Sequence, residues 1–504
     1  MELFTQRYKD KIRGVISCYD RVVLRGTLPS ICHADAATSF LKRNNIRLFD
    51  YPKWAEQYRD ELRNHTENIA RDNNIEIEFI KRVDDFRKEK RIKELVGKRG
   101  SHPGLVHIFS AMEPCDSYRA WHDKVTHVTK LKSTPGKCLH YYFYFINDDL
   151  GLCYLRVPTW APFRLQFYYN GHNELSLKLK KEGIPHEMLE NAFINISDFE
   201  RAQALADIRP DRLHMWLNRI IDEYCPVVKH FGSYHWSIMQ LEYATDIIFK
   251  KQSELKPIYE EFSRTAVLAV KAEDVATFLG RKLSAGYEDE IGNNFQTRIE
   301  GTKIKHRMGK VSIKMYDKHG LVLRIETTTN DVSFFKHHRR VEHRDGSYTM
   351  KVATVKKSIY SLHDLIKIMS DSNKRYIEFL SCIDDPTPPM KDLDKISRPS
   401  IDGTKTYKGF NLFHGSDLDL FISISNGKFN ISGFSNRHLQ ELIPDTTGRQ
   451  VSWQLKRLKK HGLIKKIKNT YKYYLTSLGK RVIYAALKLR EMAVIPLLRG
   501  QMAT

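Results

Sequence analysis

The chain has 504 residues, and 41% of them are hydrophobic, so it is long enough for several domains and apolar enough to fill their cores. Its 83 Lys and Arg residues outnumber its 60 Asp and Glu residues, which gives a formal net charge of +23. This excess suits a polyanionic partner and argues against an ordinary metabolic enzyme. No apolar run is long enough to span a bilayer and the chain does not open on a signal peptide, so we expect a cytoplasmic protein without a membrane partner.

The cysteines also bear on the compartment. There are seven, scattered along the chain, and no two of them form a Cys-x-x-Cys pair. We therefore expect buried thiols in a reducing compartment, and neither a zinc site nor a disulfide framework.

Predicted strands and helices alternate in the first part of the chain. Apolar periodicity predicts strands at 15–29, 46–49, 75–80 and 104–109, and helices at 34–44, 54–71 and 87–98. This alternation is typical of a parallel, Rossmann-like sheet, and we assign it to residues 1–135. No glycine-rich phosphate loop follows the first strand, so a nucleotide cofactor is not indicated.

Acidic residues in or just after these strands are candidate metal ligands and catalytic groups: Asp20, Asp50, Glu113 and Asp116. In parallel sheets chemistry gathers outside the carboxyl ends of the strands, and several carboxylates there would suit Mg²⁺. Such ions activate water and stabilise the leaving oxygen in phosphodiester cleavage. Asp20 and Glu113 are the preferred metal ligands, because both lie in apolar segments where an unpaired carboxylate is costly. The alternative is that all four are turn formers or salt-bridge partners.

Residues 136–262 form a second predicted region. Alternating segments at 140–146 and 152–157 flank a polar turn and predict a hairpin, while the spacing from 198 to 261 is helical. Arginines interleave with the aromatic residues here, and Arg156 and Arg164 are candidate phosphate ligands. The alternative for the rings themselves is that they pack the core.

Residues 263–385 are predicted to be rich in strands, with a hairpin at 310–326 that contains the segments IKMYDK and LRIE. These segments resemble a short sequence motif in replication-initiator proteins of phages and plasmids. The His-x-His pair of rolling-circle nucleases is missing, so we do not expect that chemistry. Two basic runs predict either a phosphate-facing patch or a solvated face, through Lys305, Arg307, Arg339 and Arg340. Residues 386–430 begin at a proline-rich break and are predicted to be a linker region.

The last region, 431–504, shows the most specific pattern. Helices are predicted at 436–443 and 449–461, and Val451, Leu455 and Leu458 share one face of the second. Gly462 supplies a helix stop, and basic, aromatic strands follow at 463–467 and 471–475. The order of helix, turn, helix and hairpin predicts a winged helix-turn-helix.

The amino-acid sequence of this region, LKRLKKHGLIKK followed by YYLTSLGKRV, resembles the winged-helix domains of MarR- and ArsR-type bacterial regulators. In that family the second helix enters the major groove and the wing touches the backbone. The resemblance implies that base edges face Arg449, Gln450, Ser452 and Trp453. It implies that phosphates face Lys456, Lys459, Lys460, Lys468 and Lys472. No acidic residue lies between Asp445 and Glu491 to cancel this charge.

The chain as a whole resembles uncharacterised bacterial proteins carried by mobile elements. We therefore predict a multidomain α/β protein: a Rossmann-like N-terminal domain, a mixed α+β centre and a C-terminal winged helix. The predicted function is a Mg²⁺-dependent nuclease or transposase-like protein that acts on DNA, with a structured RNA as a further partner. The alternatives are a DNA- or RNA-binding regulator without catalysis and a maturase-like RNA-processing scaffold.

Overall fold

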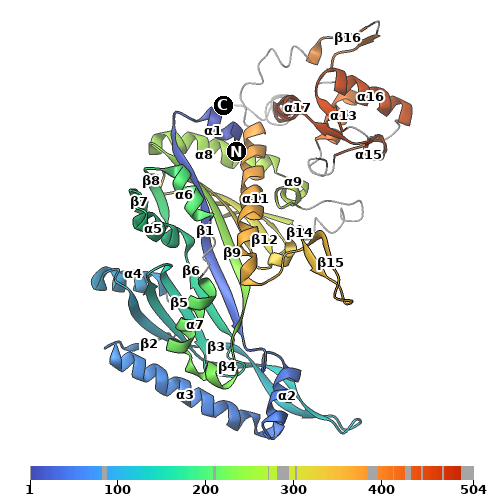
Figure 1. Cartoon of the computed structure of the whole chain (residues 1–504). Helices are drawn as coiled ribbons and strands as arrows, with labels where there is room; N and C mark the ends of the chain where they lie inside the picture. Colours follow the sequence, from blue (N-terminus) through green and yellow to red (C-terminus); the bar gives the residue numbers. More distant parts are fainter. Residues whose placement is uncertain are drawn as a thin grey trace. The chain divides into compact units, whose positions relative to one another are not determined.

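The protein has a mixed α/β structure with a large central sheet, seen in a computed structural model (Figure 1). The structure describes residues 2–81, 88–207, 212–270, 272–280, 295–300, 303–383, 396–403, 405–411, 414–425, 429, 433–443, 446–467 and 470–489. In this described part, every helix is too short or too polar to cross a membrane. The cysteines are free thiols, four of them buried and three partly buried.

The chain forms two compact units. Unit 1 comprises residues 1–15, 244–328 and 367–504, and unit 2 comprises 16–243 and 329–366. The domain ranges predicted from the sequence do not coincide with these two units. They stay predictions of how each unit is divided into smaller domains. The order of the eleven-stranded sheet is β10 (Phe295–Glu300), β11 (Lys303–Met308), β12 (Val311–Lys318), β13 (Val322–Thr329), β9 (His235–Phe249), β1 (Ile12–Thr27), β6 (Leu165–Tyr169), β5 (Gly151–Pro158), β4 (Thr129–Asn147), β3 (Gly104–His122) and β2 (Ile77–Phe79).

In unit 2 the parallel, Rossmann-like sheet predicted for residues 1–135 is wrong. β1 pairs antiparallel with β6, and β6, β5, β4 and β3 follow one another in antiparallel register, whereas β2 and β3 run parallel. Strands β3, β4 and β5 are consecutive and joined by short turns, and a short turn can join only antiparallel neighbours. The hairpin predicted around the turn at 147–151 is confirmed as β4 and β5.

Helices and short strands complete unit 2. The α-helices are α2 (Ala34–Arg43), α3 (Tyr51–Asp72), α4 (Lys88–Arg99), α5 (Gly171–Lys181), α6 (Phe199–Ala206) and α7 (Leu213–Tyr224). The 3-10 helices are η1 (Leu48–Asp50), η2 (Pro226–His230), η4 (Val332–Phe334) and η5 (Ile359–Ser361), so the strand predicted at 46–49 is wrong. The remaining strands form two pairs, β7 (His186–Leu189) with β8 (Ala192–Ile196), and β14 (Lys336–Glu342) with β15 (Tyr348–Thr354). In the core, the ring of Tyr224 stacks on those of Phe143 and Phe145.

Unit 1 contains α1 (Glu2–Arg7), α8 (Gln252–Ala269), α9 (Ala272–Phe278) and most of α11 (Leu362–Ile383). A buried ion pair crosses its part of the sheet: the guanidinium of Arg324 binds both carboxylate oxygens of Asp246 at 2.6 Å, and both side chains are 0% exposed. The helical spacing predicted for 198–261 holds for α6, α7 and α8 but is wrong at β9. The last residues of β9 are buried on both faces, so they lack the alternation that identifies a half-buried strand.

The C-terminal part of unit 1 contains β16 (Ser400–Asp402), β17 (Lys405–Tyr407), α13 (Gly415–Ile424), α15 (Asn436–Leu442), α16 (Gly448–Lys460), β18 (Ile464–Lys466), β19 (Tyr473–Leu475) and α17 (Ser477–Leu489). Val451, Leu455 and Leu458 of α16 lie in its core, as predicted. Phe410 and Leu420 pack in the same core. The compact region therefore begins well before residue 431, inside the range predicted as a linker.

Candidate functional site

The structure separates the two preferred metal ligands. Asp20 lies on β1 and Glu113 on β3, with β6, β5 and β4 between these strands. Neighbouring strands lie about 4.8 Å apart, so four steps place the two strands roughly 19 Å apart. Two carboxylates that share a metal ion must lie within a few ångströms of it. The predicted Asp20–Glu113 metal site is therefore wrong.

Glu113 is a salt-bridge partner. Its carboxylate accepts hydrogen bonds from the guanidinium of Arg156 at 2.6 Å and from the hydroxyl of Tyr142 at 2.6 Å. Burial raises the pKa of Glu113, but the hydrogen bonds from Tyr142 and Arg156 outweigh it, and the pKa lies below its usual value. This carboxylate is charged and neutralised by its neighbours, which is the alternative that the sequence left open.

The other two predicted acids lie apart from Asp20 as well. Asp116 is exposed and forms an ion pair with Arg164 at 2.7 Å, and Asp50 is exposed at the start of α3. Among the described residues, neither joins Asp20 in a group of three or more potential metal ligands. Arg156 and Arg164, the predicted phosphate ligands, each bind one of the predicted catalytic acids instead.

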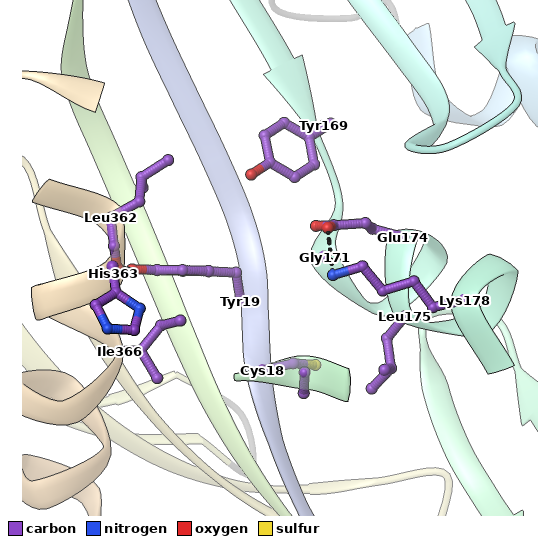
Figure 2. Close-up of a pocket in the computed structure, with 11 residues that line it drawn as sticks. Cys18, Tyr19, Tyr169, Gly171, Glu174, Leu175, Lys178, Leu362, His363 and Ile366 are labelled. Atoms are coloured by element: carbon purple, nitrogen blue, oxygen red, sulfur yellow. Dashed lines mark hydrogen bonds and ion pairs between the residues drawn. The ribbon is translucent and has the colours of Figure 1, made fainter. Parts of the chain in front are cut away.

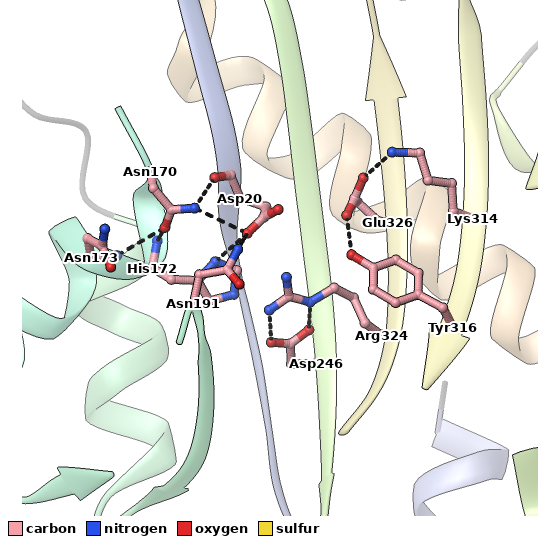
Figure 3. A network of polar contacts seen from close by, with 10 residues as sticks. All are labelled: Asp20, Asn170, His172, Asn173, Asn191, Asp246, Lys314, Tyr316, Arg324 and Glu326. Carbon is pink, nitrogen blue, oxygen red and sulfur yellow. Dashed lines mark hydrogen bonds and ion pairs between the residues drawn. The ribbon is translucent and has the colours of Figure 1, made fainter. Parts of the chain in front are cut away.

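Asp20 itself is held in a buried polar network of unit 2 (Figure 3). Its Oδ1 accepts hydrogen bonds from the amide of Asn191 at 2.8 Å and from Asn170 at 3.3 Å, and Nδ1 of His172 lies 3.0 Å away. The side chain of Asn170 also caps the first turn of α5, so one residue positions both the helix and the carboxylate. An ionised carboxylate is tolerated here because polar groups solvate it.

A second carboxylate of unit 2 lies near Asp20. One oxygen of Glu242, on β9, lies within 4.8 Å of an oxygen of Asp20. Hard oxygen donors this close together suit Mg²⁺, which needs only one or two carboxylates when substrate phosphates and water complete its shell. Arg21 brings a positive charge to the same place: burial lowers the pKa of its guanidinium, but Tyr168, Glu242 and Asp20 outweigh this effect and raise it.

A pocket of about 320 Å³ opens beside the paired arginines. Arg25, Arg156 and Arg164 line it together with His140. Burial and the nearby Arg156 lower the pKa of His140 to about 4, so this imidazole is neutral at pH 7. Since Arg156 and Arg164 are bound to acids, phosphate binding by them stays a prediction.

A smaller cavity beside α5 has no room for a ligand. Figure 2 shows the ion pair of Glu174 with Lys178, at 2.9 Å, among apolar side chains that include Leu175. The free space is about 20 Å³, enough for a single water molecule. Tyr19 points toward α11, where its hydroxyl donates to the carbonyl of Leu362. These groups stabilise the fold.

The basic face of α16 is the most extensive of the predicted binding surfaces. The exposed residues on this helix include all of the predicted contacts: Arg449, Gln450, Ser452, Trp453, Lys456, Lys459 and Lys460. Three of them have partners of their own. Gln450 accepts from the backbone of Thr447 at 2.7 Å in a capping box, Ser452 accepts from Asn436, and Lys460 pairs with Asp402.

The two-stranded hairpin after α16 carries the other predicted contacts. β18 and β19 pair antiparallel, and Lys472 and Tyr471 are exposed near their turn, with 86% of the Tyr471 side chain accessible. Lys468 lies outside the described residues. In the second predicted patch, Arg307 on β11 is exposed and Lys305 is partly buried.

Arg457 anchors α16 from its inner side. Its guanidinium is buried, binds both carboxylate oxygens of Asp417 at 2.6 and 2.9 Å, and donates to the carbonyl of Lys408 at 2.8 Å. It also lies over the ring of Phe410, 3.8 Å from the ring centre. These contacts attach the inner side of α16 to α13 and to the segment before it.

Comparisons with protein-family models, with curated proteins and with solved structures give no match for this chain. The functional argument therefore rests on the residues themselves. Sequence reasoning missed Glu242 because its segment was predicted to be helical. It also gave no role to Asn170, His172 and Asn191, whose partner Asp20 lies 150 or more positions away in the chain.

Proposed function

We propose that this protein binds nucleic acid, and that its C-terminal region is a winged helix whose α16 enters the major groove of duplex DNA. The observation that carries the proposal is the division of α16 into two faces. Val451, Leu455 and Leu458 are buried, whereas Arg449, Trp453 and the lysines are exposed. A helix of this kind, followed by a basic hairpin and free of acidic residues, is the usual geometry of duplex recognition.

The test is to replace Arg449 and Lys456 together with Ala in the full chain. We expect weaker duplex binding, because Arg449 loses a base contact and Lys456 a phosphate contact. In a plot of log affinity against log salt the slope should fall by about 1, since one phosphate contact contributes about 0.9 to it. Fluorescence anisotropy between 50 and 200 mM salt, as rough working limits, would measure both. Arg437→Ala is the matched control, since Arg437 is 89% exposed on α15 and pairs with Glu441. An unchanged slope in the double variant would contradict the proposal.

A second candidate function, Mg²⁺-dependent cleavage, is favoured by the close carboxylates of Asp20 and Glu242. The ion would activate water for attack on a phosphodiester. We expect Asp20→Asn and Glu242→Gln each to abolish cleavage while leaving duplex affinity intact. Glu113→Gln is the control, because this acid binds Arg156 instead. Cleavage that survives in both variants would show that this pair is not the catalytic site, and no cleavage by the unchanged protein would leave a non-catalytic binder. A structured RNA partner and a mobile-element role stay predictions.

A further inference from the structure

The hairpin formed by β14 and β15 is a second basic element with a defined shape. The strands pair antiparallel from Lys336↔Thr354 to Glu342↔Tyr348 and form a two-stranded sheet of their own (Figure 1). Its turn is ordered by hydrogen bonds: the backbone N–H of His343 donates to the carbonyl of Ser347 at 2.9 Å. We call residues 336–354 the β14–β15 ribbon.

The two faces of the ribbon differ. Side chains alternate along a strand, and directly paired residues share a face. One face, which we call the outer face, is exposed at every position and consists of Lys336, His338, Arg340, Glu342, Tyr348, Met350, Val352 and Thr354. The other face is partly covered, and its Arg339 donates to the backbone carbonyl of Thr354 at 2.9 Å.

The outer face combines positive charge with large apolar side chains. Tyr348 is 49% exposed, Met350 60% and Val352 66%. Arg340 lies across from Met350, and its guanidinium sits 3.6 Å from the centre of the Tyr348 ring, which fixes its direction. Contiguous exposed apolar groups mark an interaction site, and the basic residues beside them select a negatively charged partner.

Shape decides between negatively charged partners. The major groove of B-form DNA, about 12 Å wide, admits a two-stranded β-ribbon, whereas the major groove of A-form RNA is too narrow for side chains to read. In the groove, cations at the ribbon edge reach phosphates, and apolar side chains contact the methyl group of thymine. An anionic membrane would offer charge but no groove. On the outer face, the basic side chains lie on β14 and the large apolar ones on β15. This arrangement fits a DNA duplex better than it fits double-stranded RNA or a membrane surface.

We propose that the β14–β15 ribbon binds in the major groove of duplex DNA through its outer face, as a contact separate from α16. This inference rests on the proposed nucleic-acid binding, but it concerns different residues. Lys336 and Arg340 contact phosphates, and Met350 and Val352 contact the bases. Removing the two cations lowers the salt dependence, whereas removing the two apolar groups weakens binding without changing the salt slope.

The experiment uses the full chain and a DNA duplex of about 25 base pairs, long enough to span two turns of the helix. We expect the variant K336S/R340S to bind more weakly, and the slope of its log affinity against log salt to be smaller in magnitude by about 2. M350S/V352S should bind several-fold more weakly with the slope of the unchanged protein. Lys351→Ser is the matched control, because Lys351 lies on the opposite face of the same ribbon. Since all these positions are exposed, circular dichroism should show unchanged folding.

The α16 variant separates this inference from the proposed function. If R449A/K456A weakens duplex binding but K336S/R340S does not, the ribbon proposal is wrong and the winged-helix proposal stands. If only the ribbon variants lose affinity, the ribbon proposal stands alone. The binding of the same variants is also measured to a duplex RNA of the same sequence and to vesicles that contain phosphatidylglycerol. A larger loss on either of them than on DNA would overturn the assignment to the major groove.

Discussion

Two buried histidines make the stability of the fold sensitive to mild acid. His306 is 0% exposed with its Nε2 3.1 Å from the hydroxyl of Tyr376, and burial lowers its pKa to about 4. His140 is 1% exposed, and burial with the nearby Arg156 lowers its pKa to about 4 as well. In the unfolded chain each titrates near 6.5. The unfolded state therefore takes up protons first, and stability is lost as pH falls from about 6.5 to 4.

The change His306→Asn should remove one of these titrating groups. On going from pH 8 to pH 5, the unchanged protein should lose about 2 kcal/mol more stability than the variant, because a histidine with a depressed pKa favours the unfolded state there. Urea unfolding at both pH values measures this difference. His102→Asn at an exposed position serves as control. Equal losses in unchanged protein and His306→Asn would contradict the assignment.

For single residues, the sequence predicted which acidic side chains would need partners but not where those partners lie. The apolar context of Asp20 and Glu113 correctly indicated burial, since Asp20 is 9% exposed and Glu113 is partly buried. Their partners come from distant segments: Arg156 reaches Glu113 from β5. Which segments meet depends on strand order, and periodicity along one strand contains no information about its neighbours.

Among the elements, α16 depends on the ion pair of Arg457 with Asp417. Both side chains are buried, so replacing Arg457 with Met leaves a carboxylate without its charge partner. We expect a loss of about 3–5 kcal/mol in the stability of the C-terminal region, measured by hydrogen exchange of α16 amides. The double change Arg457→Met with Asp417→Leu should recover most of it. Lys460→Met, at the more exposed pair with Asp402, should cost less than about 1 kcal/mol.

Elements with a clear period were predicted well, and those without one were not. The helix α16 and the strand β5 follow the patterns of their residues, because each has one face that is buried and one that is more exposed. In β9 every residue from Tyr243 to Phe249 is buried, so the alternation that identifies a strand is absent there. Strands of a sheet that is covered on both faces lack the alternation of apolar and polar residues, so they are difficult to predict from the sequence.

For the whole molecule, the boundary of the C-terminal region has a measurable consequence. Phe410, Leu420 and Phe421 pack in the core that contains Leu455 and Leu458. A chain ended at residue 430 should expose these apolar side chains and bind a hydrophobic dye or aggregate, whereas a chain ended at residue 395 should not. Dye fluorescence and light scattering of the two shortened chains measure this. Equal behaviour would mean that residues 396–430 are a linker, as the sequence predicted.

If α16 binds DNA as proposed, the capping box at its start limits the number of base contacts that this helix can make. Gln450 is the amide side chain that would pair with adenine, but it is bound to Thr447 at the helix terminus. What remains outward is one arginine, one indole and several lysines, which favour backbone over bases. A protein that bound DNA in this way would bind many sequences with similar affinity, would slide along the duplex, and would need a second element for sequence specificity.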